Sequence, residues 1–238
     1  MNPLMLPVVA AQGLWVRART EVLPPAAGPV TGTVAEEEAG PPMRVAVLGE
    51  STAAGCGVAT HDEGFPGSLA RALAASHGCP VTWEVAGRHG ATARRIRYQL
   101  LPQLGEGYDL AVLLAGANDV LGRRSPGQWG EDLAAIVDEL TRRAGSVVVL
   151  GTPPFADFPS LPGTLARYCA ENAAGLDRAS QRICAGRPQV TWIDSNDIMQ
   201  ITGDFFARDG FHPSAHGYRQ WARAVADHAR AERRTDPR

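Results

Sequence analysis

The chain has 238 residues and a formal net charge of −2, a length that suits one α/β domain with a well-buried core and is short for two. The near-neutral charge supplies no broad positive field, which argues against nucleic acid as a partner. All 23 cationic side chains are arginines, so a P-loop lysine and a Schiff-base lysine are both excluded.

Residues 1–43 precede the first clear strand and divide into two parts. Residues 4–16 are almost entirely apolar but too few to span a bilayer. No basic residue precedes them, whereas Arg17 and Arg19 follow, so a segment docked on the domain or lying at a membrane surface is favoured over a cleaved signal. Residues 20–43 are rich in Pro, Gly, Ala and Glu, which predicts a linker.

From residue 44 onward, apolar runs alternate with amphipathic stretches, as in a parallel sheet with crossover helices. This alternation predicts one domain over residues 44–232, followed by a polar tail at 233–238. The predicted strands are 44–48, 81–86, 109–114, 146–151 and 190–193. The predicted helices lie near 65–77, 91–103, 127–143, 162–185 and 214–232. Ligands of such sheets bind beyond the carboxyl ends of the strands.

The four cysteines show neither a C-x-x-C pair nor a zinc-type spacing with the histidines. A domain of this size does not need disulfides for its stability. The sequence therefore predicts no metal site and four reduced, mostly buried thiols: Cys56, Cys79, Cys169 and Cys184.

Polar residues follow two of the predicted strands and mark a third segment near the C-terminus. Ser51 stands in a small-residue turn directly after the first strand, and Asn118 follows the apolar run 110–115. Asp209 and His212 lie three residues apart in a loop with Gly and Pro. A serine hydroxyl becomes a nucleophile when a histidine removes its proton, and a carboxylate can fix the tautomer of that histidine. We therefore predict that Ser51, His212 and Asp209 form a catalytic triad.

Each of these residues also has an ordinary structural interpretation. Ser51 alone could cap a helix, Asn118 could form an Asx-turn, Asp209 could cap a turn, and His212 could be a loop histidine without a task. Their order along the chain, with each residue at a strand end or in a terminal loop, favours catalysis over four unrelated local roles.

These motifs resemble the GDSL or SGNH hydrolase family, whose marker residues are a Ser, a Gly, an Asn and a His in separate blocks. The resemblance spans about residues 44 to 225 and matches Ser51, Gly87, Asn118 and His212 to the four blocks. It implies a three-layer α/β/α, flavodoxin-like fold with five parallel strands in the order 2-1-3-4-5. Two positions depart from the family pattern, because Glu50 replaces the usual Asp before the serine and Val85 replaces a frequent Asn.

An acyl carbonyl under attack becomes an oxyanion and needs convergent hydrogen-bond donors. The backbone N–H groups of Ser51 and Gly87 and the side-chain amide of Asn118 are the predicted donors. Gly87 suits this role because a backbone without a Cβ can approach a ligand closely.

Six further residues are candidates for substrate contact. His89 lies two residues after Gly87, and Arg123 could meet an anionic group, although such arginines are usually solvated. The insertion 152–163 carries aromatic and aliphatic residues that could line an acyl pocket or pack onto the core. The complete set is Glu50, His89, Arg123, Phe155, Phe158 and Leu161.

These features predict a cytoplasmic serine hydrolase that cleaves small-molecule or lipid esters with short to medium acyl chains, through an acyl-enzyme and without a cofactor. An acyltransferase using the same serine, with a sugar or glycerol hydroxyl as acceptor, is the first alternative. A flavodoxin-like binding module would use the same strand ends but would not need the Asp-x-x-His motif. Weak membrane-surface contact through the N-terminal segment is also expected.

Overall fold

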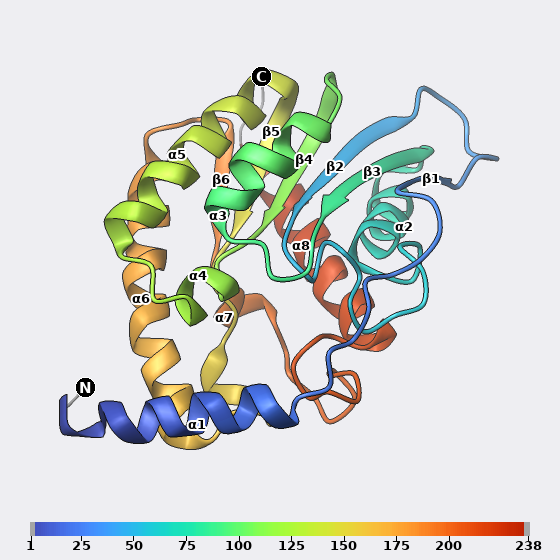
Figure 1. Cartoon of the computed structure of the whole chain (residues 1–238). Coiled ribbons are helices and arrows are strands. Elements are labelled where there is room, and N and C mark those ends of the chain that lie inside the picture. The colour runs from blue at the N-terminus through green and yellow to red at the C-terminus, as the bar shows by residue number, and fades with distance from the viewer. Residues whose placement is uncertain (1–2, 236–238) are drawn as a thin grey trace.

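A six-stranded sheet forms the centre of the computed structural model, which describes residues 3–235 (Figure 1). The strand order is β1-β3-β2-β4-β5-β6, and every neighbouring pair is parallel except β1 with β3. Counted without β1, the five parallel strands have the order 2-1-3-4-5, which confirms the predicted fold. The strands are β1 (Thr31–Val34), β2 (Met43–Gly49), β3 (Val81–Gly87), β4 (Tyr108–Leu114), β5 (Ala144–Leu150) and β6 (Val190–Ile193).

Helices cover both faces of the sheet because alternate strand residues point to opposite sides. Leu48, Leu113 and Val149 pack with residues of α5 and α6, whereas Val47 and Val112 pack with residues of α2 and α8. Figure 1 shows these two helical layers on opposite sides of the strands. The helices are α1 (Leu6–Arg19), α2 (Phe65–His77), α3 (Ala93–Arg95), α4 (Ala117–Leu121), α5 (Pro126–Arg143), α6 (Gly163–Ala185), α7 (Ser195–Ile198) and α8 (Ala215–Thr235).

The predicted linker at 20–43 contains the edge strand β1, and this corrects the sequence interpretation. Thr31 to Val34 pair antiparallel with Glu84 to Val81. Leu23 is buried, and the backbone of Ala26 donates to Ala54 O. A four-residue strand among Pro and Gly gives a weak local signal, so its pairing with β3 is what defines it.

The predicted helix at 91–103 is also interrupted. It consists of α3, a π-helical turn over Ile96–Leu100 and a 3-10 turn over Leu101–Gln103. The regular α-helix already ends at Arg95, and Pro102 in the last turn has no backbone N–H with which to continue a helical hydrogen-bond pattern.

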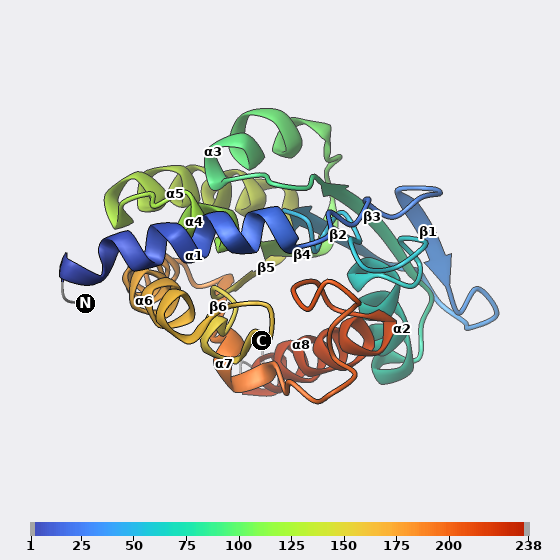
Figure 2. The same cartoon turned by 60° about the horizontal axis from the view of Figure 1, so that its bottom comes forward.

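Helix α1 packs against the domain along one side. Val9 is buried in the core, and Gln12 Oε1 accepts the backbone N–H of Leu165 at 2.9 Å. Figure 2 shows α1 crossing the end of the molecule, beside α6. Among residues 3–235, no helix has the length and apolar character needed to cross a bilayer.

Candidate active site

The nucleophile loop, residues 51–57, follows β2 and consists of successive turns on the way to α2. Its backbone bonds include Cys56 N to Ser51 O at 3.0 Å. Gly55 and Gly57 adopt φ values of 71° and 102°, a region that side chains with a Cβ rarely enter. The buried Tyr218 of α8 donates its hydroxyl hydrogen to Cys56 O at 2.7 Å, so this helix anchors the loop. The loop therefore holds Ser51 at the carboxyl edge of the sheet.

The triad loop, residues 206–213, carries Asp209 and His212 of the predicted triad and closes on itself through backbone hydrogen bonds. Ala207 N donates to His212 O at 2.8 Å, and Phe206 forms a bridge with Pro213. This closure brings together three residues separated by as many as 161 positions: His212 Nε2 lies 2.9 Å from Ser51 Oγ, and His212 Nδ1 lies 2.6 Å from Asp209 Oδ2.

The hydrogen-bond partners of Asp209 define the tautomer of His212. Burial alone would raise the pKa of Asp209, but the His212 side chain and the backbone N–H groups of Phe211 and His212 outweigh it, and the pKa is lowered. An ionised carboxylate only accepts, so Nδ1 carries the hydrogen donated to Asp209. Nε2 is then left with a lone pair that accepts the Ser51 hydroxyl, as a general base requires.

Glu50 binds the amino end of α4 and does not point a free carboxylate at a substrate. Oε1 accepts Ala117 N at 3.1 Å, and Oε2 accepts both Asn118 N at 3.1 Å and Asn118 Nδ2 at 2.7 Å. The Asn118 amide also donates to Ala91 O at 3.2 Å. Both hydrogens of this amide are therefore engaged, so donation to an oxyanion requires one of these bonds to open. The sequence pointed to Glu50 as a departure from the family motif but did not predict these partners.

The predicted oxyanion donors otherwise lie where three strands end. A Cβ on Gly87 would overlap the backbone of Ala53 and Ala54, so only glycine lets β3 pack this closely against the nucleophile loop. Within the described part of the chain, no protein acceptor is recorded for Ser51 N–H. That N–H is therefore available to a ligand.

Burial raises the pKa of Glu50 to about 7, against the opposing effect of the N–H groups of Asn118 and Ala117. The carboxylate that accepts three hydrogen bonds thus forms only as the pH rises through neutrality. Below that range a protonated, neutral Glu50 accepts these hydrogen bonds more weakly, so Asn118 is held less firmly.

This coupling leads to a prediction for the pH profile. The ionised form of Glu50 is the one that holds Asn118 most firmly, so kcat/KM should fall as the pH drops through about 7. Glu50→Gln removes this titrating group, so the acidic limb of log(kcat/KM) should become shallower, with lower activity. The measurement is kcat/KM between pH 5 and pH 9.

The matched control is Asp177→Asn, because burial also raises the pKa of Asp177 but its side chain binds Thr152, outside the cavity. This control should retain the wild-type slope. Equal slopes in wild type and Glu50→Gln would show that the protonation of Glu50 does not govern activity.

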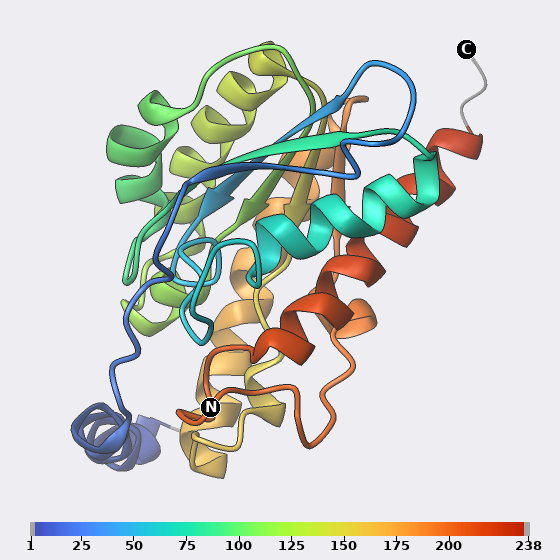
Figure 3. The same ribbon diagram turned by 90° about the vertical axis from the view of Figure 1, so that its right-hand side faces the viewer.

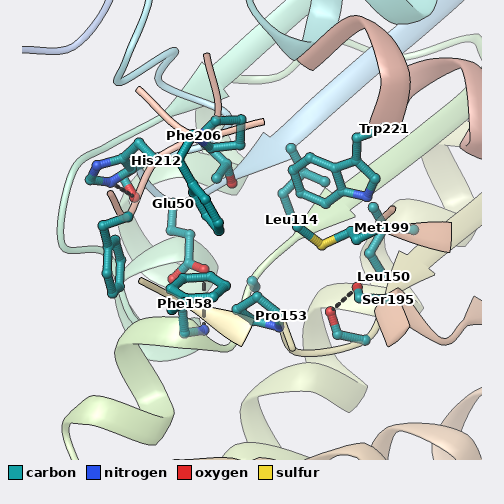
Figure 4. A pocket seen from close by; sticks show the side chains of 17 residues that line it. Glu50, Leu114, Leu150, Pro153, Phe158, Ser195, Met199, Phe206, His212 and Trp221 are labelled. Carbon is teal, nitrogen blue, oxygen red and sulfur yellow. Dashed lines mark hydrogen bonds between the residues drawn. The ribbon is translucent and has the colours of Figure 1, made fainter. Parts of the chain in front are cut away.

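A small cavity of about 40 Å³ begins at Ser51 and His212 and runs under the strand ends (Figure 4). Phe158, Phe206 and His212 lie at one end, and Trp221, Met199 and Leu150 lie at the other. A water molecule needs roughly 10–15 Å³ by this measure, so the cavity is narrow. Its walls are largely apolar, which suits a hydrocarbon group attached to the acyl carbonyl.

The structure brings only part of the predicted substrate set to this cavity. Phe158 and Glu50 line it, whereas Phe155 is fully buried and Leu161 packs in the same core, so the insertion is partly core. Arg123 is exposed and outside the lining. The insertion also supports the triad loop, because the Phe158 ring contacts Phe211 with centroids 5.2 Å apart.

His89 lies beside the triad but outside the cavity lining. Its ring centroid is 5.8 Å from that of His212, and its Nδ1 is 3.5 Å from Cys56 Sγ. Burial, with a smaller contribution from His212, lowers the pKa of His89. Cys56, His89 and His212 each have one side-chain atom that could bind a metal ion, and these three atoms lie within 4.8 Å of one another. The spacing of these residues in the sequence did not indicate this grouping.

A serine, a histidine and an aspartate joined by hydrogen bonds at the carboxyl edge of a flavodoxin-like sheet form an arrangement that is typical of serine hydrolases. The family model of the GDSL-like lipases and acylhydrolases matches residues 47–220. The chain belongs to this family.

Individual relatives agree with this assignment. The chain is 30% identical over 184 residues to a GDSL-like esterase from Mycobacterium tuberculosis, an alignment that covers 74% of this chain and spans 58% of the length of that relative. A lipase/acylhydrolase from Enterococcus faecalis has a TM-score of 0.59 at 21% identity, covering 80% of this chain and 96% of its own. The SGNH-family esterase AlinE4 has a TM-score of 0.56 at 24% identity, covering 84% and 100% respectively. The two solved structures share the fold of this chain, and the family match places the chain among the GDSL-like lipases and acylhydrolases.

Proposed function

We propose that this protein hydrolyses carboxylic esters of short to medium acyl chain length through an acyl-enzyme on Ser51. The observation that carries the proposal is the continuous relay from Ser51 Oγ through His212 to Asp209, with distances of 2.9 Å and 2.6 Å. A serine joined to a correctly protonated histidine is equipped for acyl transfer.

The reaction follows from the protonation state of this relay. Ser51 Oγ attacks the carbonyl carbon while His212 Nε2 takes the hydroxyl proton. The tetrahedral intermediate collapses, and His212 returns that proton to the departing alcohol. Water then attacks the acyl group and gives a proton to His212, and collapse releases the acid as the proton returns to Ser51 Oγ. Asp209 stays ionised and stabilises the imidazolium.

Three donors are proposed for the oxyanion: Ser51 N–H, Gly87 N–H and the Asn118 amide. Glu50 would act as a positioning residue, because its carboxylate holds the Asn118 amide at the strand ends. The Asn118 amide would exchange its hydrogen bond to Ala91 O for one to the oxyanion. This new hydrogen bond would become strong only as negative charge develops on the substrate oxygen.

Asn118→Ala tests this assignment. We expect kcat to fall by about 10²–10³-fold with little change in KM, because the lost bond forms near the transition state. Steady-state kinetics on a soluble activated ester would measure both constants. A change confined to KM would assign Asn118 to binding of the ground state.

The narrow cavity supports short acyl groups, and we propose water as the acceptor. Nitrophenyl esters of about two to eight carbons should be better substrates than long-chain esters, because a larger chain would have to displace core side chains. The test supplies each donor with and without millimolar glycerol or a glucoside and quantifies free acid and new ester by mass spectrometry. Predominant new ester would identify an acyltransferase, and exclusive turnover of long chains would require a deeper channel.

A further inference from the structure

The outer face of α1 is an uncovered apolar surface. Leu14 and Trp15 are 71% and 50% exposed, and Leu6 and Val8 are exposed nearer the start of the helix. The inner face is already occupied, because Val9 is buried in the core and Gln12 binds the backbone of α6. A helix that is apolar on all sides is normally covered on all sides, so the outer face lacks a partner in the monomer.

The charge at the end of this surface indicates the chemistry of the partner. Arg17 and Arg19 lie in the last turn of α1, and no acidic residue occurs before Glu21. The Arg19 guanidinium lies 5.1 Å from the centre of the Trp15 ring. An apolar face bordered by Trp and Arg is the pattern of a helix lying in the headgroup region of a bilayer, where arginine extends to the phosphates. A protein partner explains the apolar face but gives no reason for an acid-free, basic end.

The position of α1 relates this surface to the active site. All three ribbon views place it at the end of the molecule toward which the parallel strands run, the end that carries Ser51 (Figures 1, 2 and 3). The segment that follows it contacts the triad loop, because Arg208 Nε and Nη2 donate to Glu21 at 2.8 Å and 2.7 Å. A surface bound through α1 would therefore lie at the same end of the molecule as the active site.

We propose that the outer face of α1 docks this protein onto anionic phospholipid membranes, with the helix lying in the headgroup region. Docking depends on apolar contact through Leu14 and Trp15 and on attraction of Arg17 and Arg19 to anionic headgroups. Its consequence for the proposed function is that esters partitioned into a membrane are presented at the active-site end.

Trp15 provides a direct reporter of docking. The other four tryptophans, Trp83, Trp129, Trp192 and Trp221, are buried or half-buried. The full-length protein is mixed with vesicles of phosphatidylcholine alone or with added phosphatidylglycerol, and binding is measured by flotation. Quenching of Trp15 by lipids brominated near the headgroup should accompany binding and be strongest with anionic vesicles.

Two variants separate the apolar and ionic contributions. Leu14→Asn with Trp15→Asn should reduce vesicle partitioning on the order of 10-fold or more, because it removes two exposed apolar side chains from the contact. Arg17→Gln with Arg19→Gln should remove the preference for phosphatidylglycerol and its salt sensitivity, on the order of 10-fold at low salt. The matched control is Val30→Gln, an exposed apolar residue outside α1, which should bind as wild type does.

Several results would overturn this proposal. They are absence of wild-type binding to anionic vesicles, unchanged binding by the Leu14 and Trp15 variant, and concentration-dependent self-association through this face in sedimentation velocity without lipid. Ser51→Ala should still bind vesicles, and the Leu14 and Trp15 variant should still hydrolyse a soluble short ester. Failure of docking is therefore distinguishable from failure of the hydrolase assignment.

Discussion

Replacing Ser51 with alanine is expected to lower turnover of activated esters by on the order of 10⁴-fold or more while leaving the fold intact. The hydroxyl has one recorded side-chain hydrogen bond, to His212, so its removal costs little packing. It also removes the atom that would form the acyl-enzyme. The measurement is kcat/KM on a nitrophenyl ester, with circular dichroism to verify folding.

Ser195→Ala is the matched control for this experiment. Ser195 lines the same cavity, but its hydroxyl donates to Gly151 O at 2.6 Å and has no histidine partner among residues 3–235. Its loss should leave most activity in place. A serine-directed phosphonate should add its mass to wild type and to Ser195→Ala but not to Ser51→Ala. Retention of near-wild-type turnover by a folded Ser51→Ala protein would refute the nucleophile assignment.

His212→Ala is expected to be comparably damaging, because no other base is recorded at hydrogen-bond distance from Ser51 Oγ among the described residues. The double variant Ser51→Ala with His212→Ala should lose no more than either single variant, because the two residues act as one unit. The measurement is a double-mutant cycle in kcat/KM.

His89→Ala is the matched control for this cycle. His89 lies beside His212, but its recorded side-chain hydrogen-bond partner is Cys56 and not a carboxylate. It should keep most of the activity. Multiplicative losses in the double variant would mean that Ser51 and His212 act independently, which the relay does not allow.

The central sheet was predictable because its signals are local. Short, mostly apolar runs separated by amphipathic helices indicate parallel strands, and the observed bounds of β3, Val81–Gly87, extend the predicted 81–86 by one residue. Parallel strands also share one carboxyl edge, so Ser51, Gly87 and Asn118 could be expected near one another before any coordinates existed. The Asp-x-x-His spacing added the pairing of Asp209 with His212.

Other features follow from contacts between distant segments and have no local signal. The sequence marked Glu50 as unusual, but its hydrogen bonds to Ala117 and Asn118 exist only because β2 and β4 are neighbours in the sheet. In the same way, β1 becomes a strand through its pairing with β3, although Pro and Gly around it indicate a linker.

The sequence by itself therefore determined the five parallel strands of the sheet, the edge that carries the polar residues, and the identity of the proposed triad. Only the tertiary structure decided that Phe155 lies in the core while Phe158 lines the cavity, and that one face of α1 is anchored while the other is exposed. The physical reason is that hydrophobic periodicity reports which residues avoid water, but not which neighbours they meet. Those neighbours depend on how the layers pack, and packing involves the whole chain.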